Sequence, residues 1–385
     1  MAVYKLNEIA PIQQGTLSEN DKYWLLNLDM VESNSGKVLG YNYVSSDQIG
    51  ASTIAFDTNN VLYSKLRPYL NKVVLPTQNG YATSEMVPLR PNTNIITREY
   101  LTYLLRSPLF VTYINSKTSG AKMPRAKLDA LKNYEIDCPP IVDQVARTTR
   151  LDEIVTAAEI CREQIEKYDL LIKSRFVEMF GDLADPGCKW EKCRLVDACV
   201  NSDDIKCGPF GTQLGKDEYV EEGVAVWEIP QINSEFKTSP THFVTEKKAA
   251  ELDAYSIIPG DIAMSRKGNV GRCAVFPTTF ENGIIHSDVL RIRLDKTKAL
   301  PEFMMRQLHY SGDIQHQIEL VSSGAIMAGI NVTKLKQIFV YLPPTDLQDK
   351  FAAFVAQVDK SKAVVQSIMD KLNTLQVSLM QEYFG

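Results

Sequence analysis

The chain has 385 residues, of which 44% are hydrophobic and 23% are charged, as in an ordinary globular protein. This length exceeds the size at which a single hydrophobic core stops growing, so at least two units are expected. The formal net charge of −5 argues against a non-specific polyanion binder, which needs a widespread basic surface. The sequence contains neither a secretory leader pattern nor eighteen successive apolar residues, so secretion and membrane insertion are not expected.

The cysteines and histidines suggest no metal site. The seven cysteines are odd in number and form no C-x-x-C pair, so neither a disulfide framework nor zinc is indicated. A cytoplasmic location is therefore expected. Four histidines, His242, His286, His309 and His316, show no metal-binding grouping. The last two lie on a predicted helix and are expected at the surface.

In chain order, residues 1–137 are predicted to be mixed β structure with little helix. Short apolar runs such as 61–63 are bounded by Asn, Gly and Pro, which favour turns. Residues 98–116 have apolar positions at helical spacing and predict one helix. The second half repeats this order, with a strand-like run at 289–292 and a helix from about 302 to 320.

The second half of the chain repeats the first. Residues 138–181 and 342–385 are equally long, open on Pro-Pro and end on Phe-Gly, at an offset of 204 positions. Upstream, Ser-Gly-Ala at 119–121 corresponds to Ser-Gly-Ala at 323–325. Two copies of one globular unit, each followed by a long helix, are therefore expected to form a pseudo-twofold molecule.

Each repeated segment has apolar residues at alternating spacings of three and four, which is typical of a coiled-coil seam. Because a single helix of this length, roughly 55–60 Å, would leave its apolar stripe in water, the two helices are predicted to pack together antiparallel. The predicted seam residues are Leu151, Ile154, Ala158, Ile165, Tyr168 and Ile172 in the first segment and Val355, Val358, Val365, Met369, Leu372 and Leu379 in the second, which Lys362 interrupts.

The predicted fold class is α/β (α+β), with two pseudo-twofold-related globular domains that contain mixed β-sheets and are separated by two long antiparallel coiled-coil helices. The predicted boundaries are 1–141 for the first domain, 142–182 for the central helix, 183–345 for the second domain and 346–385 for the C-terminal helix.

Motifs of catalysis and cofactor binding are missing from the sequence. In the Gly-rich stretch 208–217, three residues rather than four separate Gly211 from Gly215, and Asp217 would repel a phosphate, so a tight turn between strands is favoured over a phosphate loop. The Pro-Pro pairs lack the preceding acidic or amide residue with which adenine methyltransferases grip a flipped base. We therefore expect a chain that is not an enzyme.

Positive charge is concentrated in three segments, 61–75, 117–132 and 262–275, which contain at most one acidic residue each. Four local patterns lie in and around them: Ser64-Lys-Leu-Arg-Pro-Tyr-Leu70 with Lys72, Ser265-Arg-Lys-Gly-Asn-Val-Gly-Arg272, the two Ser-Gly-Ala segments, and Gly208-Pro-Phe-Gly211. With these patterns the chain resembles, over its whole length, the specificity subunits of type I restriction-modification systems.

The resemblance implies two target recognition domains, each reading half of a bipartite double-stranded DNA site, on a non-catalytic subunit that positions two methyltransferase subunits and the restriction and translocase subunits. No cofactor is expected on this chain, and S-adenosylmethionine, ATP and Mg are expected in those partners. Two alternatives remain open: a duplicated coiled-coil adaptor or scaffold without DNA specificity and, less favoured, a stand-alone DNA methyltransferase or nuclease.

The basic loops suit phosphate contacts or guanine readout in the major groove, and Asn side chains could read adenine. For any single residue a solvated loop charge is an equally good interpretation, and for Tyr69 a core position is favoured. The candidate DNA-binding residues are Lys65, Arg67, Tyr69, Lys72, Lys122, Arg125, Lys127, Arg266, Lys267, Asn269, Arg272, Asn331 and Lys334.

Overall fold

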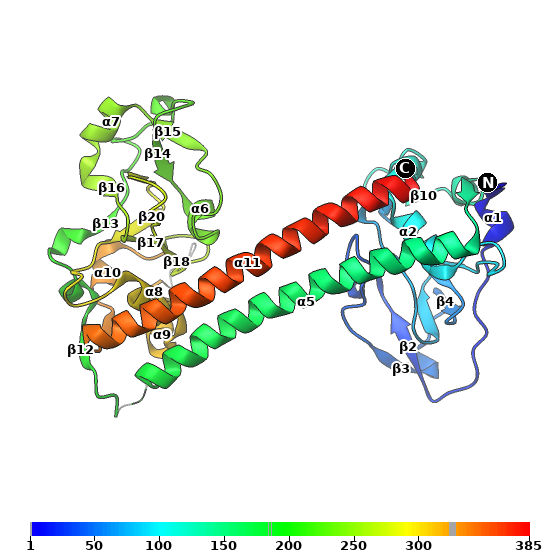
Figure 1. Cartoon of the computed structure of the whole chain (residues 1–385), viewed down its shortest axis with the longest axis horizontal. Coiled ribbons are helices and arrows are strands. Elements are labelled where there is room, and N and C mark those ends of the chain that lie inside the picture. Colours follow the sequence, from blue (N-terminus) through cyan, green and yellow to red (C-terminus); the bar gives the residue numbers. More distant parts are fainter. Residues whose placement is uncertain (1, 184, 186, 323–328) are drawn as a thin grey trace. The chain divides into compact units, whose positions relative to one another are not determined.

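The computed structural model describes residues 2–183, 185, 187–322 and 329–385, so the Ser-Gly-Ala pattern at 323–325 lies outside the described residues. The chain divides into two compact units. Unit 1 comprises Met1–Gln164 and Val365–Gly385, and unit 2 comprises Ile165–Val364. Each unit contains small β-sheets, short helices and a part of both long helices (Figure 1), which confirms the predicted mixed α/β class.

A four-stranded mixed sheet occurs in both units with the same topology. Its two central strands are parallel, and each outer strand pairs antiparallel with its neighbour. In unit 1 the order is β3 (Tyr43–Ser45), β2 (Lys22–Leu26), β7 (Gly80–Thr83) and β4 (Thr53–Phe56). In unit 2 it is β15 (His242–Val244), β14 (Val224–Trp227), β19 (Gly283–Ile285) and β16 (Ser256–Ile257).

Each mixed sheet contains a buried tryptophan that packs against a phenylalanine. Trp24 of β2 and Trp227 of β14 are both 1% exposed. Each packs edge-on against a phenylalanine, Phe56 in unit 1 and Phe276 in unit 2, with ring centroids 5.3 Å apart in both pairs. The parallel neighbour strand begins with glycine in both units, and a Cβ atom there would collide with the tryptophan residue. The close approach of the parallel strands therefore requires glycine.

A second, antiparallel sheet lies in the larger core of each unit. All residues of its main strands, Val61–Ser64 (β5), Met86–Leu89 (β8), Ile262–Ser265 (β17) and Val289–Ile292 (β20), are buried, so these strands are covered on both faces. The short helices that follow supply the covering apolar side chains. The order is β6 (Val73–Val74), β5 (Val61–Ser64) and β8 (Met86–Leu89) in unit 1, and β13 (Ile205–Cys207), β20 (Val289–Ile292), β17 (Ile262–Ser265) and β18 (Cys273–Val275) in unit 2.

The prediction of one helix over 98–116 was wrong, because two helices occupy this segment. Helix α2 (Arg98–Arg106) ends at Ser107, whose extended backbone starts α3 (Pro108–Asn115) and whose hydroxyl accepts a hydrogen bond from the Phe110 amide at 3.3 Å. The second predicted helix is likewise divided, into α8 (Pro301–Tyr310) and α9 (Gly312–Ser322). Apolar periodicity continues across each break since both helices face one core.

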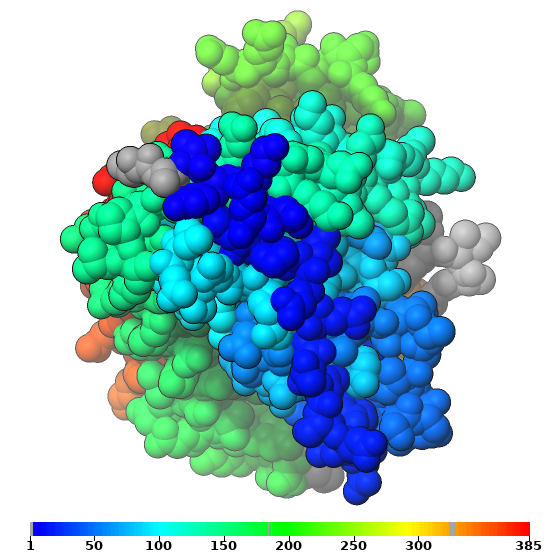
Figure 2. All heavy atoms as spheres, turned by 90° about the vertical axis from the view of Figure 1, so that its right-hand side faces the viewer, coloured from blue at the N-terminus to red at the C-terminus, as the bar shows by residue number. Residues whose placement is uncertain are grey.

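An antiparallel strand pair precedes each long helix. In unit 1, β1 (Ala2–Lys5) pairs with β11 (Glu135–Cys138), and the N-terminal segment that contains β1 and the short helix α1 (Leu6–Ile9) runs across one face of the molecule before β2 (Figure 2). In unit 2, β12 (Glu191–Arg194) pairs with β21 (Phe339–Leu342). The Pro-Pro pairs follow β11 and β21, and the helices α5 (Ile141–Phe180) and α11 (Thr345–Phe384) then begin at corresponding residues and contain 40 residues each.

A buried glutamine ties the first turn of each long helix to the globular part of its own unit. The Gln348 side chain is fully buried, accepts a hydrogen bond from the Leu300 amide at 2.8 Å, and donates to the carbonyls of Lys298 at 3.0 Å and Pro343 at 2.7 Å. Gln144 is equally buried and makes the corresponding contacts in unit 1, with Thr97, Ile95 and Pro139. Both glutamines lie four residues after the second proline, a repeat that the sequence analysis overlooked.

The two long helices pack against each other within each unit. In unit 2 the end of α5 contacts the beginning of α11 through Phe176 and Phe351, and in unit 1 Leu151 of α5 contacts Tyr383 near the end of α11. These contacts make the helices antiparallel, as predicted. Of the seam residues, Leu151, Ile154, Ala158, Ile172, Val355, Val358 and Val365 are buried, whereas Ile165, Tyr168, Met369, Leu372 and Leu379 are partly exposed.

Lys362, which interrupts the seam, has a partner on the other long helix. Its ammonium lies 2.6 Å from the carboxylate of Asp169, and both residues belong to unit 2. Among the described residues, none of the helices has the combination of length and apolar character needed to cross a membrane.

Replacing Gln348 by alanine should lower the free energy of unfolding by about 2–3 kcal/mol, because three backbone groups would lose the hydrogen bonds that this buried side chain makes. Urea denaturation of the purified chain measures this change. The matched control is Gln366→Ala on the same helix, where the side chain is exposed and donates a hydrogen bond to Asp370 one turn away; it should cost less than about 0.5 kcal/mol. Equal losses in the two variants would show that Gln348 is no anchor.

Candidate nucleic-acid interface

In unit 1 the loop after β5, residues 65–72, is held in one conformation by its neighbours. Arg67 has φ of 48° and Asn71 has φ of 50°, both in the left-handed region, on either side of a short turn of 3₁₀ helix. The Arg67 amide donates to the Pro124 carbonyl at 2.7 Å, and Leu66 forms a β-bridge with Arg125. The basic segments 61–75 and 117–132, which are separate in the sequence, therefore meet in one surface.

The candidate side chains of unit 1 differ in exposure. Arg67, Tyr69, Lys122 and Lys127 are exposed, while Lys65 is partly buried. Tyr69 is 52% exposed, so the core position favoured by the sequence analysis was wrong. The ring follows Pro68 on the short turn, where it is available to a ligand.

Arg125 is engaged by a carboxylate on the same surface. Its guanidinium donates from Nε and from a terminal nitrogen to the Glu85 carboxylate, at 3.0 and 2.7 Å. The hydrogen bonds from Arg125 hold the pKa of Glu85 below its ordinary value. Arg125 is therefore oriented before any ligand arrives, and part of its charge is neutralised.

The loop after β17 in unit 2 is supported in the same way. The Arg266 amide donates to the Asp288 carbonyl at 2.9 Å, the Ile330 amide donates to the Arg266 carbonyl at 3.1 Å, and Lys267 forms a β-bridge with Gly329. In unit 1, the Lys65 amide donates to the Glu85 carbonyl at 3.0 Å, and the Ala126 amide donates to the Lys65 carbonyl at 2.8 Å. The two candidate loops thus occupy corresponding places in the two units.

The side chains of the unit 2 loop are also fixed. The Arg266 guanidinium donates to the carbonyls of Ile330 at 3.2 Å and Ser287 at 3.3 Å, and lies 5.4 Å from the ring centroid of Phe210. Lys267 is paired with Asp288 at 2.8 Å. Arg266 therefore presents an ordered planar cation beside the exposed ring of Phe210.

Several other candidates have structural partners. The Lys72 ammonium donates to the Leu28 carbonyl at 2.6 Å, and the Lys334 ammonium donates to the Val321 carbonyl at 2.7 Å. Asn331 caps a short helix, α10 (Val332–Lys336), where its Oδ1 accepts from the Lys334 amide at 2.8 Å. The sequence shows which residues are polar but not these carbonyl partners, which come from other parts of the chain.

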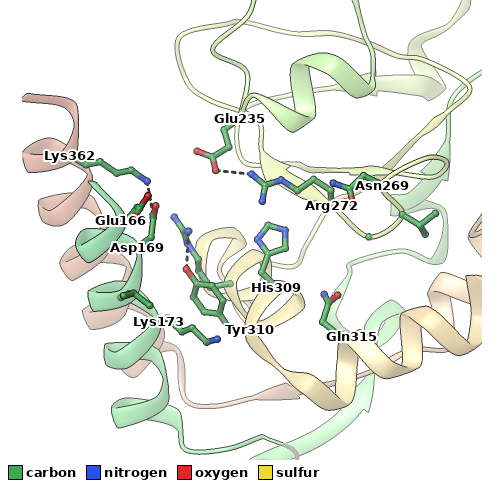
Figure 3. A pocket seen from close by; sticks show the side chains of 14 residues that line it. Glu166, Asp169, Lys173, Glu235, Asn269, Arg272, His309, Tyr310, Gln315 and Lys362 are labelled. Atoms are coloured by element: carbon green, nitrogen blue, oxygen red, sulfur yellow. Dashed lines mark hydrogen bonds and ion pairs between the residues drawn. The ribbon is translucent and has the colours of Figure 1, made fainter. Parts of the chain in front are cut away.

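Arg272 and Asn269, the remaining candidates, line a cavity of about 740 Å³ in unit 2 (Figure 3). The cavity lies between the loop after β17, which contains both residues, and the long helices. In this view Arg272 faces Glu235, at 3.3 Å, and Lys362 faces Asp169. Unit 1 has a cavity of about 450 Å³ at the corresponding residues. The corresponding lining residues are His309, Asp169, Lys173 and Lys362 in unit 2, and Arg106, Asn373, Val377 and Ala158 in unit 1.

The cavity in unit 2 is strongly charged. Burial raises the pKa of Glu302, which is paired with Arg306 at 2.7 Å. His309 is partly buried rather than at the surface as predicted, and burial together with Arg272 and Arg306 lowers its pKa to about 4. The Cys273 amide donates to His309 Nε2 at 3.2 Å, which a neutral imidazole can accept. His316 is exposed, as predicted.

The Gly-rich stretch lies in the loop between β13 and β14, which contains the 3₁₀ helix Lys216–Glu218 and is longer than the tight turn favoured above. Within the ranges that the structure describes, no group of three or more His, Cys, Asp or Glu side chains is placed to hold a metal ion. Three polar side chains at one end of the mixed sheet of unit 2, Glu228, His242 and His286, come together in a recess. The sequence analysis did not group them, because they follow or begin three different strands.

Comparison with known proteins finds a similar family and similar solved structures. Residues 1–167 match the family model described as type I restriction modification DNA specificity domain. The chain is thus similar to the specificity subunits of type I restriction-modification systems. It is 27% identical over 135 residues to the type I restriction enzyme EcoDI specificity subunit of Escherichia coli, a match that covers 35% of this chain and 30% of that protein.

A longer match joins the chain to the type I restriction enzyme StySPI specificity subunit of Salmonella potsdam, with 22% identity over 312 residues, 77% of this chain and 66% of that protein. The chain thus spans between about a third and two thirds of the length of these relatives.

Two solved structures show the same fold. A chain from a study of complex assembly and conformational transition of the type I R-M system has a TM-score of 0.61 at 17% identity, with 100% of this chain and 97% of that chain covered. The type I restriction-modification S subunit from M. genitalium has a TM-score of 0.60 at 16% identity, with 100% and 96% covered.

The Glu85–Arg125 pair should make the stability of unit 1 depend on pH. Because the pKa of Glu85 is lowered in the folded state, its contribution is present above the ordinary value of 4.5 and is lost as the pH falls through the lowered pKa. Solvent screens this partly exposed pair, so Glu85→Gln should cost less than about 1 kcal/mol at pH 7, and the cost should decrease as the pH falls toward 3. Urea denaturation at both pH values measures this difference.

The control is the same substitution in an Arg125→Gln background, where the partner is already missing. There the Glu85→Gln change should have no pH-dependent effect. A similar pH dependence in both backgrounds would assign the lowered pKa to another group.

Proposed function

We propose that the chain is the DNA sequence-specificity subunit of a type I restriction-modification enzyme and binds a bipartite double-stranded target. Unit 1 contacts one half-site through the loop 65–72 together with the segment 117–127. Unit 2 contacts the other half-site through the loop 266–272. The exposed cations of these loops contact phosphates, and Arg266, which is held in a fixed orientation, is suited to a planar acceptor such as the guanine edge.

The observation that carries this proposal is the corresponding support of a basic loop in both units of a chain whose net charge is negative. In each unit a β-bridge joins the loop to a second segment, Leu66 to Arg125 in unit 1 and Lys267 to Gly329 in unit 2. The residue before the bridge donates one backbone hydrogen bond through its amide and accepts one through its carbonyl in both units. Its side chain is lysine in unit 1 and arginine in unit 2. A shared scaffold with different side chains is what two readers of different half-sites need.

We further propose that the chain is non-catalytic and acts in the cytoplasm with two methyltransferase subunits and with restriction and translocase subunits. S-adenosylmethionine, ATP and Mg belong to those partners. Large apolar side chains on the long helices support a protein partner there, since Leu170 and Leu171 in unit 2 and Ile368 and Leu375 in unit 1 are between 46% and 62% exposed. A coiled-coil adaptor without DNA specificity would share these helices but would need no basic loops.

Methylome sequencing of cells that express the chain with its methyltransferase subunit tests the proposal. One bipartite methylated motif should appear, and it should vanish when the chain is omitted. Replacing residues 1–137 by the same region of a related chain should change one half-site and leave the other intact, because each unit has its own core. Methylation by the chain alone, or a motif that is independent of the chain, would refute this function.

The structure separates the roles of Arg67 and Lys72. Arg67→Gln removes an exposed cation, so it should weaken DNA binding and reduce the salt dependence by about 0.9 in the slope of log K against log salt if one phosphate contact is lost. Lys72→Met should instead lower the free energy of unfolding by about 1–2 kcal/mol, because the Leu28 carbonyl loses its charged donor. DNA titrations at several salt concentrations and urea denaturation distinguish these outcomes. Equal DNA-binding defects in both variants would contradict the assignment.

A further inference from the structure

A recess in unit 2 lies at the end of its mixed sheet. Glu228 and His286 directly follow the parallel neighbours β14 and β19, and His242 begins the adjacent antiparallel strand β15. Side chains that follow neighbouring parallel strands emerge at one edge of a sheet, which is where α/β sheets bind ligands. The recess has a volume of about 700 Å³, enough for a nucleobase, and Tyr219 and Leu214 line it.

Hydrogen bonds orient the carboxylate in this recess. Glu228 Oε2 accepts from His242 Nδ1 at 2.8 Å and from the Thr241 hydroxyl at 3.2 Å. The ring of Tyr219 lies against the His242 ring, with centroids 4.6 Å apart. Oε2 therefore accepts hydrogen bonds from Thr241 and His242, while the other oxygen, Oε1, is directed toward His286.

His286 is fixed in one tautomer. The Asp288 amide donates to His286 Nδ1 at 3.2 Å, so Nδ1 is an acceptor and the proton of the neutral ring is on Nε2. Nε2 lies 3.9 Å from Glu228 Oε1, beyond hydrogen-bonding distance. The recess therefore presents an acceptor and a donor next to each other, and neither satisfies the other.

The recess adjoins the candidate DNA-binding loop of unit 2. Ser287, which also lines the recess, offers its carbonyl to Arg266 at 3.3 Å, and the next residue, Asp288, pairs with Lys267. Pro209 and Gly211 of the recess wall flank Phe210, the ring beside Arg266. A base contacted by this loop would therefore have the recess next to it.

We propose that Glu228 and His286 together read an adenine in the half-site of unit 2, an inference that rests on the proposed function. Adenine presents an N6 amino group and the N7 acceptor side by side on its major-groove edge. Glu228 Oε1 accepts from N6, and His286 Nε2 donates to N7. His242 and Thr241 are positioning residues, because they hold the carboxylate through Oε2.

The other three bases fit this pair less well. Guanine and thymine present carbonyl oxygens, O6 and O4, which the Glu228 carboxylate would repel. Cytosine has an amino group for the carboxylate but offers His286 no N7 acceptor. Each side chain therefore excludes a different set of bases, and only adenine satisfies both.

The test is the methylation motif of cells that express the chain with its methyltransferase subunit. The parent should show adenine at one position of the unit 2 half-site. Glu228→Ala should admit guanine there, because His286 still reads N7, and His286→Ala should admit cytosine, because Glu228 still reads the amino group. Each change should reduce discrimination by on the order of tenfold or more. The control Glu222→Ala, at an exposed position on the loop before β14, should leave the motif unchanged.

Binding of the assembled complex to modified DNA gives a second measurement that does not depend on activity. Replacing the adenine by 7-deazaadenine, which lacks N7, should weaken binding of the parent by about tenfold and leave the His286→Ala complex unaffected. Removing the amino group should spare the Glu228→Ala complex in the same way. Half-site 1 serves as the internal reference for folding in every variant.

Three results would overturn the inference: a unit 2 half-site without adenine, variants that keep the parental motif, or variants that lose every position of their half-site equally. All three leave the proposed function intact, since the parent still methylates a bipartite motif. A parent without any motif would refute the proposed function itself, and this inference with it.

Discussion

Neither long helix can expose its apolar stripe to water over 40 residues, and the packing of one against the other follows from this constraint. Phe176 and Phe351 pack with ring centroids 5.5 Å apart, and Leu151 and Tyr383 make the contact in the other unit. Each helix also starts from a strand and a Pro-Pro pair in its own unit, where a buried glutamine fixes its direction. The globular part of each unit is therefore joined rigidly to the first turn of one helix.

The duplicated scaffold carries different chemistry in its two copies. The recognition loops are supported by the same β-bridges, and an acidic residue, Glu85 or Asp288, lies at the corresponding position in each. Glu85 pairs with Arg125, which lies on the segment bridged to the loop in unit 1. Asp288 pairs with Lys267, which lies on the loop itself in unit 2. The helix-side cavities show the same divergence, since Ala158 and Val377 in unit 1 correspond to Lys362 and Lys173 in unit 2. Side chains changed while the backbone support stayed the same.

Errors of the sequence analysis came from treating residue type as a measure of environment. An aromatic ring suggested burial for Tyr69, yet the left-handed backbone of Arg67 turns this part of the loop outward. The basic residue Lys72 suggested a ligand contact, and the sequence did not reveal that its ammonium donates to the Leu28 carbonyl. Continuous apolar periodicity suggested one helix over 98–116, yet Ser107 and Pro108 start a new helix that faces the same core.

The sequence by itself determined the duplication, the two long helices and their antiparallel pairing, because these features rest on repeated motifs and on periodicity sustained over tens of residues. Only the tertiary structure decided which side chains meet. Arg125 reaches Glu85, and Glu228 meets His286, through a β-bridge and a parallel strand pair that join distant segments. The register of such pairings is set by packing of the whole core, and no local pattern in the sequence records it.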